Sequence, residues 1–271
     1  MIQNITIGQY FPGNSLIHKL DARMKIALTV ILMASVFISK NAYGLALSVA
    51  ITAFTVLLSR VNLKVIFKGV KPIIIIVLIT ALLNLFYGTG EPIAQFWIFR
   101  ITEKGIISAV LMSFRVILLV LIGLMLTYTT TPTRLTDAIE ALLKPLHTLF
   151  KLDIHSLAMT MTIALRFIPT LVEEVDKIMS AQKSRGADME SGGLLKRVKA
   201  IVPVLIPLFV SSFRRAGELA EAMDCRCYRG GEGRTKMNRM HLVARDYIAL
   251  CAVLVYLAAV IMLRVFITGV V

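Results

Sequence analysis

The sequence predicts an all-α integral membrane protein with about five transmembrane helices and long amphipathic cytoplasmic helices. Of its 271 residues, 57% are hydrophobic and only 17% are charged, whereas soluble domains carry about 25% charged residues. The mean hydropathy is +0.79. The formal net charge is nevertheless +14, so the charged residues must lie mostly outside the apolar segments. These observations indicate that a lipid bilayer is the main solvent of the chain.

Five apolar segments approach the length of about 20 residues that a helix needs to cross a bilayer. They are Met24–Ile38, Tyr43–Ser59, Pro72–Tyr87, Gly105–Tyr128 and Asp246–Ile267. Arg115 lies within the fourth segment. Because a lipid-facing charge is costly, we expect Arg115 to pack against neighbouring helices; a role in handling substrate is the alternative.

The distribution of basic residues predicts the orientation of the chain. Lysine and arginine precede the first segment and cluster between the second and third, so the N-terminus is expected in the cytoplasm. Four crossings return the chain to that side. We therefore predict an N-terminal membrane domain with four spans (1–128), a cytoplasmic or interfacial helical region (129–245) and a C-terminal transmembrane helix (246–271). The middle region holds 18 of the 30 lysine and arginine residues.

The middle region begins with a short amphipathic pattern. It starts near Thr133 and runs towards Leu143, and Pro145 is expected to break or kink the helix there.

Two long helices follow. Asp153 is the expected N-cap of the first, which runs from Ile154 to about Arg185 and is ended by Gly186. The second runs from about Leu194 to Cys227. Each is apolar in one half and charged in the other, so we expect both to begin at the membrane surface and to end in water. Both contain prolines that bend them, namely Pro169, Pro203 and Pro207.

No enzymatic signature is present in the sequence. It has no G-x-x-x-x-G-K-[ST] phosphate loop and no His-Glu-x-x-His pair, and its histidines are scattered. Cys225 and Cys227 are closer in sequence than the usual zinc pair. Glu173 and Glu174 are adjacent on a helix, point in different directions and are expected to be solvated. The sequence thus predicts a non-catalytic protein without metal or cofactor.

The excess of basic residues in the middle region is explained better by membrane lipids than by nucleic acid. It lies beside a membrane and is interleaved with acidic residues, and few aromatic residues are available for base stacking. Anionic lipid head groups account for much of the basic excess. We therefore expect membrane lipids as partners and no nucleic acid.

Two arginines stand out because their surroundings repeat. Arg185 and Arg226 each lie in the last turn of a long helix between small residues, in Ser184-Arg185-Gly186 and Cys225-Arg226-Cys227. Attraction to the helix C-terminus explains a single terminal arginine. The repetition favours a second explanation, in which each exposed guanidinium binds a carboxylate of a partner. A helix of this length places the two tips up to about 50 Å apart, which suits a partner with two similar sockets.

Several motifs resemble the transmembrane T component of energy-coupling factor (ECF) transporters, which are micronutrient importers of the ABC class. The N-terminal similarity lies in residues 10–15 and in His-Lys-Leu-Asp-Ala-Arg-Met-Lys at 18–25. Arg-Phe-Ile-Pro-Thr-Leu at 166–171 and Ala-Gln-Lys-Ser-Arg-Gly-Ala at 181–187 resemble the first coupling helix. Residues 214–223 and 230–235 resemble the second. The chain departs from the family pattern at Ser184, where alanine is usual, and at Cys227, where glycine is frequent.

The resemblance implies a non-catalytic coupling subunit in the plasma membrane of a prokaryote. Its partners would be two ABC-type ATPase subunits and one substrate-binding S component. The ATPases would dock at Ser184, Arg185 and Gly186 and at Cys225, Arg226 and Cys227. The S component would pack on the apolar halves of the long helices, at Leu157, Met161, Leu165, Phe167, Val202, Leu205, Leu208 and Phe209.

Three alternatives remain at the level of the sequence. The first is a T component dedicated to cobalt or nickel instead of one shared among several S components. The second is a self-sufficient permease that uses Arg115, and the third is a membrane enzyme. Polar residues are scarce within the spans and no acid, base or metal set is clustered, so the coupling subunit is preferred.

Overall fold

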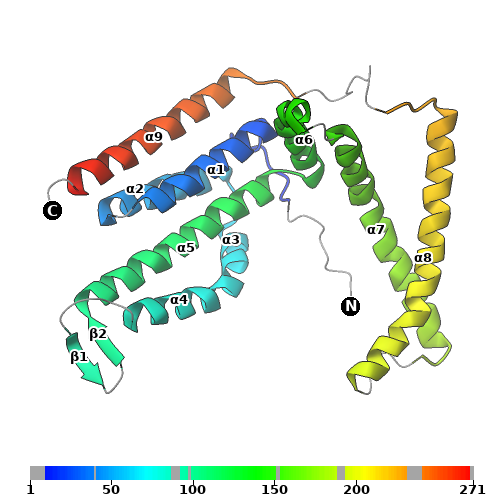
Figure 1. The fold of residues 1–271 in the computed structure, drawn as a ribbon, viewed down its shortest axis with the longest axis horizontal. Helices are drawn as coiled ribbons and strands as arrows, with labels where there is room; N and C mark the ends of the chain where they lie inside the picture. The colour runs from blue at the N-terminus through cyan, green and yellow to red at the C-terminus, as the bar shows by residue number, and fades with distance from the viewer. Residues whose placement is uncertain are drawn as a thin grey trace. The chain divides into compact units, whose positions relative to one another are not determined.

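A computed structural model describes residues 10–39, 41–86, 92–96, 99–150, 153–187, 193–230 and 240–268, and most of them are helical (Figure 1). The elements are α1 (Ala22–Ile38), α2 (Ala42–Ser59), α3 (Leu63–Val70), a 3-10 turn (Lys71–Ile73), α4 (Ile74–Phe86), β1 (Pro92–Phe96), β2 (Phe99–Thr102), α5 (Glu103–Thr129), α6 (Pro132–Phe150), α7 (Ile154–Ser184), α8 (Leu194–Cys225) and α9 (Ala244–Thr268). The predicted all-α membrane class is confirmed. Strands β1 and β2, which the sequence did not predict, form one short antiparallel hairpin.

Six of the described helical segments are long and apolar enough to cross a membrane. Four of them coincide with the second to fifth predicted spans to within one residue at the C-terminal end, and the third begins earlier than predicted because α3 leads into α4. Helix α1, with 17 residues, is the first predicted span and is not among the six. The remaining two lie in α7 and α8. Their predicted path, from the membrane surface into water, stays a prediction.

The described residues separate into two compact units. Residues 10–138 and 240–268 form one, which we call the membrane unit because it holds the five predicted spans. Residues 139–230 of the described chain belong to the other, which we call the helix-pair unit after α7 and α8. Helix α6 crosses the boundary; it continues through Pro145 to Phe150 and does not end near Leu143.

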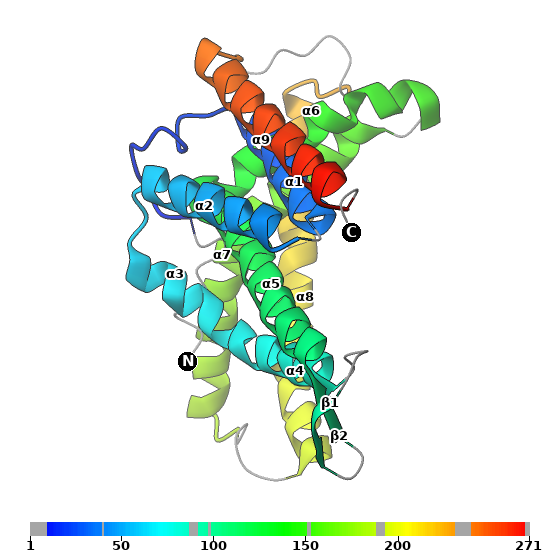
Figure 2. The ribbon, with the colours of Figure 1, turned by 90° about the vertical axis from the view of Figure 1, so that its left-hand side faces the viewer.

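Helix α5 is the centre of the membrane unit and packs against α1, α2, α3 and α4 (Figure 2). Leu118 and Ile122 of α5 form one buried cluster with Val36 and Leu45. Tyr128, at the end of α5, forms a second cluster with Ile66 and Met125. The longest helix of the membrane unit therefore packs through its buried side chains against four neighbours, as van der Waals packing in a bilayer favours.

Two basic side chains cap the C-terminal ends of α1 and α5 reciprocally. Lys25 of α1 is buried, and its Nζ donates to the Thr129 carbonyl at the end of α5 at 2.8 Å. Arg115 of α5 donates from Nη2 to the Ser39 carbonyl, at the C-cap of α1, at 2.5 Å. The two helices are thus antiparallel. Each cation meets a carbonyl that has no partner within its helix, at the negative end of the helix dipole.

We expect Lys25→Met to destabilise the membrane unit by about 1–3 kcal/mol, because the buried Thr129 carbonyl loses its closest donor. The measurement is the thermal unfolding midpoint of the purified protein in mild detergent. Lys19→Met is the matched control, since Lys19 is exposed. Equal midpoints for the two variants would contradict a capping role for Lys25.

Helix α9 is attached to α1 and α2 by buried polar groups. The Asp246 carboxylate, in the first turn of α9, accepts from the backbone nitrogens of Asp21 at 2.9 Å and Val243 at 2.8 Å. Further along, the Tyr256 hydroxyl donates to Ser48 at 2.7 Å and lies 3.0 Å from the Ser35 hydroxyl. The starts of α1 and α9 and the end of α5 therefore lie at one end of the membrane unit.

Candidate functional site: two arginine-capped helix ends

Helices α7 and α8 form an antiparallel pair held by polar contacts near its middle. The Glu174 carboxylate of α7 accepts from Arg215 of α8 at 2.9 Å, and it also accepts from the Ser211 hydroxyl. Nearer the end of α7, the Gln182 amide donates to the Pro203 carbonyl at 3.4 Å. Residues later in α7 contact residues earlier in α8. The helices are therefore antiparallel, and their C-terminal ends lie at opposite ends of the pair. The expectation that Glu174 is solvated is wrong, because Arg215 lies against it.

The first arginine motif is the C-terminal cap of α7. The Asp153 side chain caps the start of this helix, as predicted, by accepting from the Ser156 nitrogen at 3.2 Å. At its end, Arg185 is the C-cap residue and Gly186 has a φ of 85°. The nitrogens of Gly186 and Ala187 donate to the carbonyls of Lys183 and Gln182, each at 3.0 Å. This pair of bonds defines a Schellman motif, which ends a helix abruptly.

The second arginine motif has the same backbone geometry. Arg226 is the C-cap residue of α8, and Cys227 follows with a φ of 55°. The nitrogens of Cys227 and Tyr228 donate to the carbonyls of Asp224 at 2.9 Å and Met223 at 3.1 Å. The repeated sequence pattern therefore corresponds to a repeated structure. Cys227 therefore occupies a left-handed position, a conformation that favours glycine.

All six candidate residues, Ser184, Arg185, Gly186, Cys225, Arg226 and Cys227, are exposed. Within the described chain, neither guanidinium forms a hydrogen bond or ion pair with an acidic side chain. Because a Schellman motif turns the following chain away from the helix axis, each arginine is left at the tip of its helix.

The two left-handed positions predict opposite effects of substitution. Gly186→Ala should destabilise the α7 cap by about 1 kcal/mol, and Cys227→Gly should stabilise the α8 cap by a similar amount. A Cβ at Gly186 would meet nothing within 4 Å, so the cost there is conformational. The hydrogen-exchange rates of the backbone amides in the two caps measure both changes in stability. Gly193→Ala is the control, since Gly193 has a φ of −67° and equally open surroundings; a comparable loss in that variant would contradict the conformational explanation.

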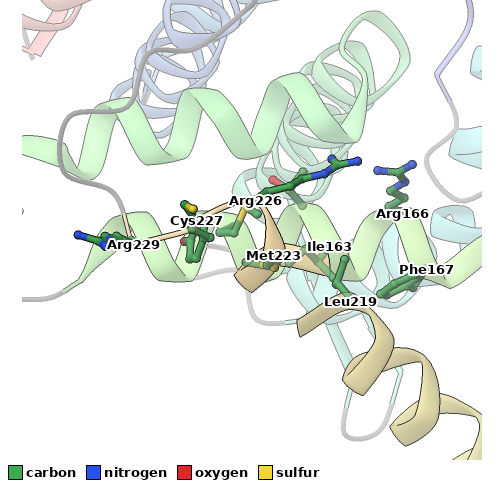
Figure 3. Close-up of a pocket in the computed structure, with 12 residues that line it drawn as sticks. Ile163, Arg166, Phe167, Leu219, Met223, Arg226, Cys227 and Arg229 are labelled. Atoms are coloured by element: carbon green, nitrogen blue, oxygen red, sulfur yellow. The ribbon is translucent and has the colours of Figure 1, made fainter. Parts of the chain in front are cut away.

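A pocket of about 580 Å³ lies within the helix-pair unit, where the first half of α7 meets the end of α8 (Figure 3). Its lining is apolar along both helices and includes three arginines: Arg166, Arg226 and Arg229. Arg166 belongs to the motif at 166–171 but had no predicted role, and Arg229 was not among the predicted functional residues. Arg166 could have been recognised from the sequence because it is an arginine in the apolar half of α7.

The apolar candidates on the pair differ in exposure. Leu157 is 53% exposed, Met161 40%, Val202 44%, Leu205 42% and Phe209 60%. Leu165, Phe167 and Leu208 are half-buried. Exposed apolar surface on two adjacent helices has to be covered by lipid or by another protein.

The N-terminal signature residues lie in the membrane unit and have structural roles. The Asp21 side chain caps α1 by accepting from the Arg23 nitrogen at 2.9 Å. His18 is buried, with Nδ1 2.6 Å from the Ser15 hydroxyl and Nε2 3.0 Å from the Phe11 carbonyl. Burial lowers the pKa of His18, and Lys25 adds to the effect, while the hydrogen bond to Phe11 opposes it. The described residues contain no group of His, Cys, Asp or Glu that could hold a metal ion.

Fold and site together define an all-α, multi-pass membrane protein that carries two exposed arginines on the ends of a helix pair. Residues 13–237 match the family model CbiQ, described as a cobalt transport protein. The energy-coupling factor transporter transmembrane protein EcfT of Clostridium kluyveri is 51% identical, over 93% of this chain and 94% of its own length. EcfT of Ruminiclostridium cellulolyticum is 49% identical (97% and 98%), and EcfT of Bacillus subtilis is 46% identical (97% and 100%).

The chain therefore belongs to the CbiQ/EcfT family of energy-coupling factor transporter transmembrane proteins. This confirms the resemblance that the sequence motifs indicated.

Proposed function

We propose that this chain is the coupling subunit of an ECF-type importer. It transmits ATP-driven motion of two ATPase subunits to a substrate-binding S component that takes up a vitamin or another micronutrient. The observation that carries the proposal is the pair of exposed arginine caps, Arg185 and Arg226, at opposite ends of α7 and α8.

Each cap suits a docking contact with one ATPase. Arginine presents a planar fork of donors that binds a carboxylate in a fixed orientation. Its neighbours are small: Ser184 and Gly186 on one side, Cys225 and Cys227 on the other. A groove on each ATPase can therefore enclose the helix tip without steric conflict. The equal geometry of the caps supports two equivalent or similar partners.

The helix pair suits transmission of the motion. When ATP binding draws the two ATPases together, the groove on each ATPase moves the helix tip that it encloses. The contact of Glu174 with Arg215 holds the helices at their crossing, so a displacement of the tips shifts α7 and α8 against each other. The exposed apolar residues from Leu157 to Phe167 and from Val202 to Phe209 offer a surface against which the S component packs.

The proposed orientation places the N-terminus and the helix-pair unit in the cytoplasm of a prokaryotic cell. The basic residues at the start of α1 support it, as does the joint position of the starts of α1 and α9 and the end of α5. The proposed division keeps four spans before residue 129 and one after residue 245.

The other candidate functions receive less support. In a permease that used Arg115, this side chain would face a substrate path, but its guanidinium donates to the Ser39 carbonyl between two packed helices. A T component dedicated to cobalt fits the description of the family model as a cobalt transport protein. The relatives named above carry no metal in their names, so a shared T component is preferred.

Purification in mild detergent tests the proposal. We expect two nucleotide-binding subunits and one small hydrophobic protein to co-purify with the chain. The identity of the small protein should change with the vitamin that is left out of the growth medium. Recovery of the chain alone would refute the coupling function. Recovery of the same small protein under all conditions, with cobalt or nickel as its ligand, would support the dedicated transporter.

A further inference from the structure

The pocket beside the end of α8 combines cationic and apolar walls. Its twelve lining residues include Arg166 of α7 and, from the end of α8 onward, Arg226 and Arg229. In Figure 3, Arg166 and Arg226 direct their guanidinium groups to the same side of the pocket, and Arg229 extends at its other end. The remaining lining is mostly apolar: Met159, Ile163, Phe167, Leu219 and Met223.

The charges around this pocket are not balanced within the part of the chain that the structure describes. None of the lining residues is acidic, and all three arginines are exposed. Like charges that face one space repel each other, and the repulsion is relieved when an anion enters between them. The apolar lining adds a second requirement, because it favours a ligand that also buries hydrocarbon.

We propose that this pocket is a socket for a segment of one ATPase that carries an apolar side chain next to one or more carboxylates. The inference rests on the proposed docking function and extends it. Arg226 enters the ATPase, while Arg166, Arg229 and the apolar lining receive a segment from it in return. A peptide segment supplies several carboxylates and an apolar side chain at fixed spacing, which matches Arg166 and Arg229 beside one apolar lining.

The socket makes the two docking ends unequal. Arg185 does not line this pocket, and it lies at the opposite end of the helix pair. Docking at the α7 end therefore depends on its cap alone. Docking at the α8 end depends on the cap and on two further arginines, and it should be the more salt-sensitive contact.

Two variants that each keep only one docking end test the socket. In Arg185→Glu only the α8 end can hold an ATPase, and in Arg226→Glu only the α7 end can. Adding Arg166→Gln should weaken retention of the remaining ATPase roughly tenfold or more in the first background, because a charge-assisted contact is lost, and leave the second unchanged. Arg229→Gln should behave alike. Arg214→Gln is the control, since Arg214 is exposed on α8 and does not line the pocket.

The outcomes separate the socket from the docking function. Native mass spectrometry gives the number of ATPases per chain. If the two single-end variants each keep two ATPases, docking itself is wrong. If each loses one, but Arg166→Gln has no effect or acts in both backgrounds, only the socket is overturned. Loss of bound phosphatidylglycerol in Arg166→Gln, with ATPase retention unchanged, would identify the pocket as a lipid site and overturn the socket as well.

Discussion

The double variant Arg185→Glu/Arg226→Glu is expected to remain in the membrane and to lose both ATPase subunits on purification. Both arginines are exposed, and within the described residues neither is bound to an acidic side chain, so the folded protein does not depend on them. Charge reversal removes the guanidinium from a carboxylate partner and places like charges together. Breaking such a contact costs about 2–5 kcal/mol per end, enough to raise the dissociation constant for that ATPase about thirtyfold or more.

The measurement is the ATPase-to-chain ratio after affinity purification in mild detergent. Each single variant should retain one ATPase and the double variant none. Arg214→Glu is the control for a reversed charge on an exposed part of α8 away from either cap. A double variant that keeps a stoichiometric pair of ATPases would contradict docking through the arginine caps.

Reversing the charge of Glu174 should leave both ATPases bound but abolish substrate uptake, in contrast to the double arginine variant, which loses the ATPases. Glu174 is the residue on which Arg215 and Ser211 converge, with side-chain exposures of 21% for Glu174 and 33% for Arg215. In Glu174→Arg two guanidiniums face each other at the crossing. The lost charge-assisted bonds weaken the crossing by about 1.5–3 kcal/mol, so a displacement of the helix tips is no longer converted into a shift of α7 against α8.

Uptake of the substrate bound by the co-purifying S component measures this effect, and we expect a decrease of about tenfold or more. Glu173→Arg is a closely matched control, because Glu173 is the adjacent residue on α7 and is exposed. The exchange Glu174→Arg/Arg215→Glu should restore part of the uptake. Full uptake in Glu174→Arg alone would show that the crossing plays no part in coupling.

The local structure of the two candidate ends could be predicted closely from the sequence. Asp153 was expected to cap α7 and does so, and Gly186 was expected to end it and has the required positive φ. The predicted start of α8 at Leu194 is also found. A helix end depends on residues within about one turn of it, and those residues are adjacent in the sequence. For the same reason the exposed position of both arginine motifs was predictable from their small neighbours.

The segments beyond the helices were less predictable. The β1–β2 hairpin was missed, since its residues showed no alternation strong enough to be recognised among apolar neighbours. Most of the motif at 230–235 lies outside the described residues.

By itself the sequence determined the membrane class, the start and end of α7, the start of α8, the two arginine motifs and the family. Only the tertiary structure decided which partner each charged side chain meets. Glu174 and Arg215 are 41 residues apart, Arg115 and Ser39 are 76 apart, and Lys25 and Thr129 are 104 apart. It likewise joined Arg166 and Arg226 in one pocket. The physical reason is that caps and hydrophobic periodicity are local properties of the chain, whereas the partner of a charged side chain depends on how whole helices pack.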